Sequence, residues 1–244
     1  MKNPELTPPY ARYLVHLIRP FPNFDAFFIK SVREKAVQLL KLKPGDCVLD
    51  VGCGPGGSFP YLVSAVGPTG EVIGVEISPE VAINARRRIR KNRWRNVRVI
   101  EADARTVELE GKFDALLSFA AADIYASPQA LDNLFPCLKD DARIVAFGAK
   151  FTRRASGGLL NPALRVLWKL SFASTPPVNY EPWAPLRERL RHLQVEEYFF
   201  GCMFLAWGGS PVVSQILGPT PESRQVNDSD GADCINGVPE HDCD

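Results

Sequence analysis

The 244-residue sequence predicts a doubly wound α/β fold, in which helices cover both faces of a mainly parallel sheet. Three observations lead to this prediction. Short apolar runs alternate with amphipathic helical patterns at the spacing of βαβ units. A glycine-rich segment directly follows the first apolar run. Near the end of the chain, two strand-like runs are separated by Gly201 alone, which permits an antiparallel hairpin but no parallel crossover.

The predicted elements follow one another in a regular order. Helical periodicity and capping signals predict helices at Phe27–Leu40, Ser58–Ala65, Pro79–Lys91, Pro128–Leu138 and Trp183–Leu193. Buried strands are expected wherever a short run is continuously apolar or rich in β-branched residues. These runs are Cys47–Val51, Glu71–Val75, Val97–Ile100, Phe113–Phe119 and Ala142–Phe147, and the final hairpin joins Val195–Phe200 to Cys202–Trp207.

The chain divides into an N-terminal arm, one domain over residues 27–210 that contains an insertion, and a C-terminal tail. Residues 1–26 are rich in proline and aromatic residues and are expected to form an N-terminal arm. Residues 150–182 are an apolar and aromatic insertion with basic flanks, either a substrate lid that touches a membrane surface or a cover for the sheet. Residues 211–244 gain Pro, Ser, Asp and Gly, so we expect disorder there.

Composition makes several classes of function unfavourable. The net charge of +1 gives no global attraction for polyanions, and the basic run Arg86–Arg95 is interpreted as a solvated helix face rather than an RNA site. Four of the six cysteines, Cys47, Cys53, Cys137 and Cys202, lack the paired short spacings of metal sites or disulfide frameworks. Cys234 and Cys243 of the polar tail could be metal or disulfide partners, but we interpret them as incidental thiols. No secretory signal pattern and no apolar window of about 18 residues is found. We therefore expect a cytoplasmic protein without a metal, touching a membrane at most peripherally.

The segment Val48–Gly57 is the clearest functional motif, because a buried strand runs there into a glycine-rich turn that opens a helix. Glycines let a ligand lie against the main chain, and the helix N-terminus offers N–H donors. The spacing is ambiguous by itself. Gly52, Gly54 and Gly57 satisfy the dinucleotide pattern G-x-G-x-x-G, whereas Gly52, Gly54 and Gly56 satisfy G-x-G-x-G.

Three acidic residues at successive strand ends favour a cationic nucleoside as the ligand. Asp50 precedes the first glycine, where its carboxylate suits an ammonium or sulfonium group and would repel a pyrophosphate. Glu76 closes the second strand, where an acceptor for two ribose hydroxyls is needed. Asp103 follows the third strand and could accept a hydrogen bond from an adenine amino group.

With these motifs in order, the sequence resembles the class I S-adenosylmethionine-dependent methyltransferases, a group that includes quinone and phospholipid methylating enzymes. The resemblance covers roughly residues 27–150. It implies a Rossmann-like seven-stranded sheet of order 3-2-1-4-5-7-6 with an antiparallel C-terminal hairpin, and S-adenosylmethionine as cofactor. The implied acceptor is a small or lipid-like molecule, such as a quinone or a phospholipid headgroup.

The resemblance also implies a role for each residue that matches the motifs. Asp50 would hold the ammonium group, and the Gly52-Cys53-Gly54 turn with Gly56 would lie beneath the methionine part. Glu76 and Ile77 would meet the ribose side. Asp103 and Ala104 would read the adenine, and Ser118 and Phe119 would line the reacting side.

No residue is required as a catalytic base, because methyl transfer depends mainly on aligning the two reactants in a dry pocket. Asp123 and Tyr125 are candidates to orient a substrate amine or hydroxyl, although Asp123 could equally cap a loop. Residues 118–123 lack the Asn-Pro-Pro-Tyr type motif of enzymes that methylate nucleobase amines. An RNA methyltransferase and, less favoured, a nicotinamide oxidoreductase remain the alternatives.

Overall fold

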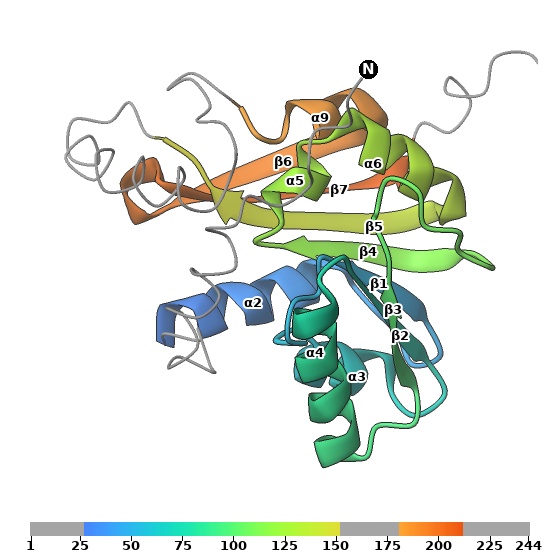
Figure 1. Cartoon of the computed structure of the whole chain (residues 1–244). Helices are drawn as coiled ribbons and strands as arrows, with labels where there is room; N and C mark the ends of the chain where they lie inside the picture. Colours follow the sequence, from blue (N-terminus) through green and yellow to red (C-terminus); the bar gives the residue numbers. More distant parts are fainter. Residues whose placement is uncertain (1–26, 152–180, 212–244) are drawn as a thin grey trace, which may run out of the picture.

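A computed structural model describes residues 27–151 and 181–211 of the chain. They form a seven-stranded sheet of order β3-β2-β1-β4-β5-β7-β6 (Figure 1). Strands β1 to β5 are parallel, and β7 runs antiparallel to both β5 and β6. The predicted fold class, strand order and terminal hairpin are thereby confirmed. The predicted arm, nearly all of the predicted lid and nearly all of the predicted tail lie outside the described residues and stay predictions.

The helices and strands alternate along the chain until the final hairpin. The strands are β1 (Cys47–Val51), β2 (Glu71–Glu76), β3 (Val97–Glu101), β4 (Phe113–Phe119), β5 (Leu138–Ala149), β6 (Leu190–Tyr198) and β7 (Met203–Pro211). The helices are α2 (Phe27–Leu39), α3 (Phe59–Val66), α4 (Pro79–Asn92), α5 (Ala122–Tyr125), α6 (Pro128–Leu134) and α9 (Ala184–Arg189), with 3₁₀ turns at Phe135–Cys137 and Phe199–Gly201.

Two apolar clusters, one on each face of the sheet, hold the layers together. Helices α2, α3 and α4 cover one face, where Val48 of β1 packs with Phe59 and Leu62 of α3. Helices α5, α6 and α9 cover the other face, where Leu49 packs with Leu131 and Leu186 (Figure 1). Consecutive residues of β1 thus enter opposite clusters, which is why the strand is apolar throughout rather than alternating.

The predicted helix Trp183–Leu193 is too long, and this is a correction of the sequence interpretation. Helix α9 ends at Arg189, and the chain enters β6 at Leu190. Pairing with β7 takes over because Leu190, Arg191 and the residues from Gln194 to Tyr198 gain ladder partners there. The ladder is irregular between Arg191 and Gln194, where His192 has a φ of 58°.

The predicted helix Pro128–Leu138 also ends early. Helix α6 stops at Leu134, and a 3₁₀ turn over Phe135–Cys137 leads directly into β5. Pro136 has no N–H to continue the α-helical hydrogen bonds. The chain therefore forms a 3₁₀ turn there and then adopts the extended conformation of a strand. As a result β5 begins at Leu138, earlier than the predicted start at Ala142.

Candidate functional site

The sheet topology brings the predicted site residues to one edge. Strand β1 pairs in parallel with both β2 and β4, so the carboxyl ends of these three strands meet there. The chain order reverses between β1 and β4, and such a switch point is where doubly wound sheets bind ligands. Asp50 lies beside Gly74 of β2 and Leu117 of β4 in the ladder.

The glycine-rich turn after β1 is fixed by contacts that exclude larger side chains. The N–H groups of Gly52 and Cys53 donate to the carbonyl oxygen of Val75, at 2.8 and 3.1 Å. Gly52 has a φ of 70°, and a Cβ there would lie 2.5 Å from the Cβ of Ala121. The turn therefore needs glycine at its first position for reasons of both backbone conformation and space.

Gly54 differs from Gly52 because its open side faces no protein atom. Its φ is 56°, and a Cβ built on it would have no described neighbour within 4 Å. Its N–H donates to Oε2 of Glu76 at 3.0 Å. The main chain at Gly54 is thus open on one side and lies beside the Glu76 carboxylate. A side chain at this position would fill the open space, which a ligand can occupy instead.

Asp50 is a buried carboxylate without a neutralising contact. Its residue is 1% exposed, and neither carboxylate oxygen has a hydrogen-bond partner among the residues that the structure describes. Burial raises the pKa of Asp50 to about 7; Arg33 opposes the rise, and Glu76 adds to it. A buried polar group without a partner costs free energy, so this carboxylate indicates a site for a cationic group.

Glu76 is held in one orientation by main-chain donors. Oε1 accepts from the Ser78 N–H at 2.9 Å, and Oε2 accepts from the Gly54 N–H at 3.0 Å. Burial raises the pKa of Glu76, and these hydrogen bonds counteract the rise. Each oxygen keeps further acceptor capacity, so the carboxylate can bind a pair of hydroxyls. The next residue, Ile77, is 45% exposed beside it.

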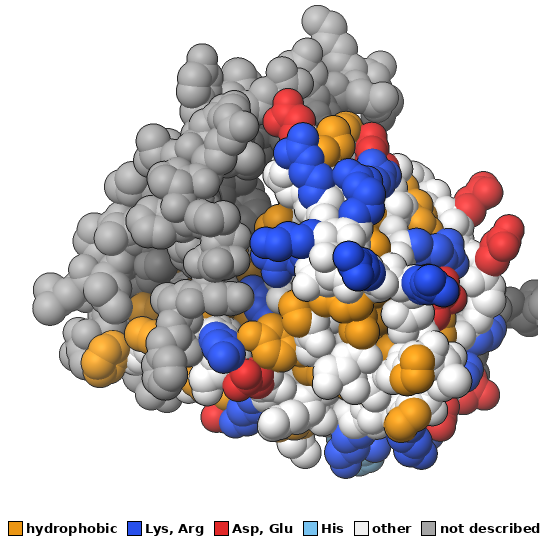
Figure 2. Space-filling model, turned by 90° about the horizontal axis from the view of Figure 1, so that it is seen from below, with side chains coloured by type: hydrophobic (Ala, Val, Ile, Leu, Met, Phe, Trp, Pro, Cys, Tyr) orange, Lys and Arg blue, Asp and Glu red, His pale blue; other side chains and the backbone are white. Residues whose placement is uncertain are grey.

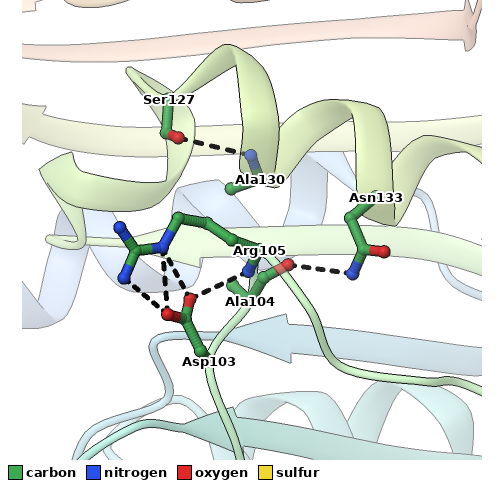
Figure 3. A network of polar contacts seen from close by, with 6 residues as sticks. All are labelled: Asp103, Ala104, Arg105, Ser127, Ala130 and Asn133. Atoms are coloured by element: carbon green, nitrogen blue, oxygen red, sulfur yellow. Dashed lines mark hydrogen bonds and ion pairs between the residues drawn. The ribbon is translucent and has the colours of Figure 1, made fainter. Parts of the chain in front are cut away.

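Asp103 is already paired within the chain, which the sequence did not predict. The Arg105 side chain reaches both carboxylate oxygens, with Nε at 2.9 and 3.0 Å (Figure 3). Hydrogen bonds from Arg105 hold the pKa of Asp103 below its usual range. The Asn133 side chain fixes the same loop, because it donates to the carbonyl oxygens of Ala104 and Val107 at 3.1 and 2.9 Å. A ligand that donates a hydrogen bond to Asp103 must therefore bind a carboxylate to which Arg105 is also bonded.

The residues after β4 divide into buried and exposed groups. Ser118 is fully buried and Phe119 is 7% exposed, and the chain reaches the surface at Ala120. Direct ligand contact therefore stays a prediction for both Ser118 and Phe119. Asp123 is exposed near the start of α5, and it raises the pKa of Glu76 through its charge. Asp123 thus lies at the rim of the same site.

Tyr125, the other predicted catalytic residue, lies in the core. It is 1% exposed, and its ring packs edge-on against Phe204 with a centroid distance of 5.5 Å. A Cβ on Gly148 would clash with the Tyr125 hydroxyl, so the side chain is seated directly on the main chain of β5. This placement favours a packing role for Tyr125 over a catalytic one.

Arg33 of α2 is a site residue that the sequence interpretation missed. Its Nη1 donates to Oγ of Ser58 at 2.8 Å, and its guanidinium lies 4.1 Å from the centroid of the Phe119 ring. Its charge also lowers the pKa of Asp50. One sequence signal was present, because Arg33 interrupts the buried stripe of α2 that includes Ile29, Val32, Ala36 and Val37.

Comparison with known proteins supports the resemblance found in the sequence. Residues 48–141 match the family described as "Methyltransferase domain". A demethylmenaquinone methyltransferase of Lactobacillus johnsonii is 28% identical over 59% of this chain and 57% of its own length. A protein-L-isoaspartate O-methyltransferase of Aeropyrum pernix is 37% identical over 37% of this chain and 35% of its own length. The chain therefore spans well under two thirds of these relatives.

Solved structures agree on the fold. A methyltransferase from Aquifex aeolicus, described as SAM dependent, covers 84% of this chain and all of its own, at 21% identity and a TM-score of 0.56. Residues 48–141 thus match a methyltransferase domain, and they lie within a sheet whose strand order is the one predicted for the class I fold. Among the helices of residues 27–151 and 181–211, none has the length and apolar character needed to cross a membrane.

Proposed function

We propose that this chain, whose residues 48–141 match a methyltransferase domain, binds S-adenosylmethionine and transfers its methyl group to a small or lipid-like acceptor. The buried carboxylate of Asp50, which has no hydrogen-bond partner within residues 27–151 and 181–211, is the observation that carries the proposal. It lies directly before a turn whose bare main chain at Gly54 borders open space. A ligand with an ammonium group and an adjoining nucleoside satisfies both features, whereas a pyrophosphate would be repelled by Asp50.

Each part of the cofactor has a complementary group in the proposal. Asp50 binds the ammonium group, and the guanidinium of Arg33, which Ser58 and Phe119 hold in place, binds the methionine carboxylate. Glu76 accepts from the two ribose hydroxyls, with its orientation fixed by main-chain N–H groups. Asp103 and Ala104 bind the adenine, and Ile77 covers one side of it.

The chain contributes to methyl transfer by positioning the methyl group and its acceptor. S-adenosylmethionine, when bound, supplies an electrophilic methyl group with a good leaving group already attached. The Gly52–Gly56 turn and the carboxylates orient this group, and the buried residues after β4 exclude water from beneath it. Asp123 at the rim accepts a hydrogen bond from the acceptor's N–H or O–H and so directs its lone pair toward the methyl group.

A small or lipid-like acceptor is favoured over the alternatives. The relative from Lactobacillus johnsonii bears the name of an enzyme that acts on demethylmenaquinone, and the sequence predicts an apolar insertion at residues 150–182. An RNA acceptor is less favoured because the basic run of α4 lies at the opposite end of that helix from Glu76. A nicotinamide cofactor is disfavoured by the position of Asp50.

We expect S-adenosylhomocysteine to bind the protein, and NADH not to bind, in isothermal titration. Glu76→Ala should weaken S-adenosylhomocysteine binding by about 30-fold or more, because charge-assisted hydrogen bonds to the ribose are lost and the Gly54 turn loses its partner. Glu80→Ala, an exposed acidic residue one turn along the chain, is the control and should change affinity by less than about twofold. Tight NADH binding that competes with S-adenosylhomocysteine would contradict the proposal.

The proposed role of Arg33 can be tested by comparing two ligands, one with and one without the amino acid part. Arg33→Ala should weaken S-adenosylhomocysteine binding by about 10- to 100-fold, the value of a charged hydrogen bond, and leave 5′-methylthioadenosine binding within about twofold. The second ligand has no amino acid part, so it serves as the internal control. Arg33→Lys should recover part of the loss. An equal loss for both ligands would mean that Arg33 supports the fold rather than the carboxylate.

A further inference from the structure

The basic run that begins at Arg86 is not used by the proposed site. Helix α4 has 14 residues, so at 1.5 Å per residue its two ends lie roughly 20 Å apart. Its first turn follows Glu76 at the site edge, and its last turn carries Arg90 and Lys91 at the far end. A molecule bound at this far end would leave the cofactor pocket open.

Two of the arginines in this region are neutralised by acidic neighbours. Arg86 pairs with Glu101 at 3.1 Å, and Arg98 pairs with Glu71 at 2.8 Å. Six further cations form no ion pair with any residue of the described ranges, and we call this set the basic surface. It consists of Arg87, Arg88, Arg90, Lys91, Arg93 and Arg95. All except the half-buried Arg88 are exposed.

The basic surface is compact and carries a local cost in free energy. Arg87 stands three and four residues before Arg90 and Lys91, and like charges at these spacings destabilise a helix by about 0.2–0.5 kcal/mol per pair. Arg93 extends the cluster beyond the helix with a left-handed φ of 56°. Figure 2 shows Lys and Arg side chains gathered on the end of the molecule that carries α4. An anionic partner would relieve this repulsion.

The chemistry of the surface discriminates between anionic partners. Five of its six cations are arginines, whose guanidinium groups bind phosphate oxygens in pairs. Insertion into a bilayer is favoured by exposed aromatic side chains among the cations. The aromatic residue of the run, Trp94, instead turns inward and packs edge-on against Phe59 at a centroid distance of 6.5 Å. The basic surface therefore offers guanidinium groups for phosphates, but its Trp94 is not available for insertion into a bilayer. A phosphate-bearing partner that stays in water fits the surface better than a lipid bilayer does.

We propose that the basic surface, which the sequence analysis interprets as a solvated helix face, binds the phosphate backbone of folded RNA, as a docking contact separate from the methyl acceptor. The cations occupy one helix end and the turn after it rather than a long ridge. Closely spaced phosphates of a folded RNA match that shape better than a straight DNA duplex. The Asn92 side chain is bonded to the carbonyl oxygen of Arg88 at 2.8 Å, which leaves the five arginines and Lys91 to make the contacts. Contacts of these cations with phosphate oxygens carry no sequence information.

Fluorescence anisotropy with a labelled RNA hairpin tests the proposal, at salt concentrations from 50 to 300 mM. The variant is Arg90→Gln/Lys91→Gln/Arg95→Gln, and the charge-matched control is Lys30→Gln/Arg187→Gln/Arg191→Gln, three surface cations on other elements. The variant should bind about 10-fold or more weakly at 100 mM salt, with a log–log salt slope reduced by about two, and the control should match the wild type. S-adenosylhomocysteine affinity should be unchanged in both, which separates this test from that of the proposed function.

Three results would overturn the proposal. One is wild-type binding to the hairpin that stays undetectable at 50 mM salt. Another is an equal loss of affinity in the variant and the control, which would assign the binding to net charge alone. The third is tighter binding to a DNA duplex of the same length, or to phosphatidylserine vesicles, than to the hairpin.

Discussion

Asp50→Asn is expected to stabilise the ligand-free protein at pH 8 while abolishing its binding of S-adenosylhomocysteine. Burial raises the folded-state pKa of Asp50 from 3.8 to about 7. The folded state therefore holds this proton more tightly than the unfolded state does. The ionised carboxylate lowers stability progressively as pH rises above about 4, and the loss is complete above pH 7. At about 1.4 kcal/mol per pH unit the cost reaches roughly 4 kcal/mol, which asparagine removes.

Thermal unfolding of wild type and variant between pH 5 and pH 9 measures this effect. The two melting temperatures should converge at low pH and separate as pH rises, with the variant higher. Asp141→Asn, a change at an exposed carboxylate of β5, is the control and should alter stability by less than about 0.5 kcal/mol. An Asp50→Asn protein that is less stable at pH 8, or that binds S-adenosylhomocysteine normally, would show that the carboxylate has a structural partner.

Gly54→Val should leave the protein folded but weaken S-adenosylhomocysteine binding by about 100-fold or more, because the added side chain occupies the open side of the turn. No described atom lies within 4 Å of the new Cβ, so the fold loses only the cost of a left-handed φ of 56° in a β-branched residue. That cost is about 1–3 kcal/mol. Isothermal titration with a melting curve on the same sample separates the two effects.

Gly111 provides a matched control for this experiment. It too has a positive φ, 87°, with no described atom within 4 Å of a built Cβ, and it precedes β4 at the other edge of the sheet. Gly111→Val should therefore lose comparable stability and keep its affinity for S-adenosylhomocysteine. Equal loss of binding in the two variants would mean that backbone strain, rather than occupation of the turn, is responsible.

The central part of the fold could be predicted from sequence because its signals are local and mutually consistent. The apolar run Cys47–Val51 and the turn after it specify a strand, a tight bend and a helix start within a few residues. The close spacing around Gly201 allows a hairpin and no parallel crossover. The start of β6 could not be predicted in this way. Its first residue, Leu190, continues a helical pattern and becomes a strand only by pairing with β7.

The site was predictable where it follows strand ends and unpredictable where it depends on distant partners. Asp50 and Glu76 lie where the motif order indicated, whereas Arg33 reaches Ser58 across 25 residues of sequence. Arg105 neutralises Asp103 from two residues away, and an Arg at that spacing gives no signal of its own. Tyr125 looked equally polar and accessible in the sequence, but packing against Gly148 and Phe204 buries it.

The hydrogen bond from Gly54 to Glu76 has a consequence for the catalytic cycle. It joins the turn under the proposed amino acid part to the carboxylate under the proposed ribose. The reaction alters neither part, because the change is confined to the sulfur, which loses its methyl group and its positive charge. The spent cofactor would then be held almost as firmly as the fresh one, so its departure would limit turnover. Removing S-adenosylhomocysteine enzymatically during an assay should accordingly prolong the linear phase of the reaction.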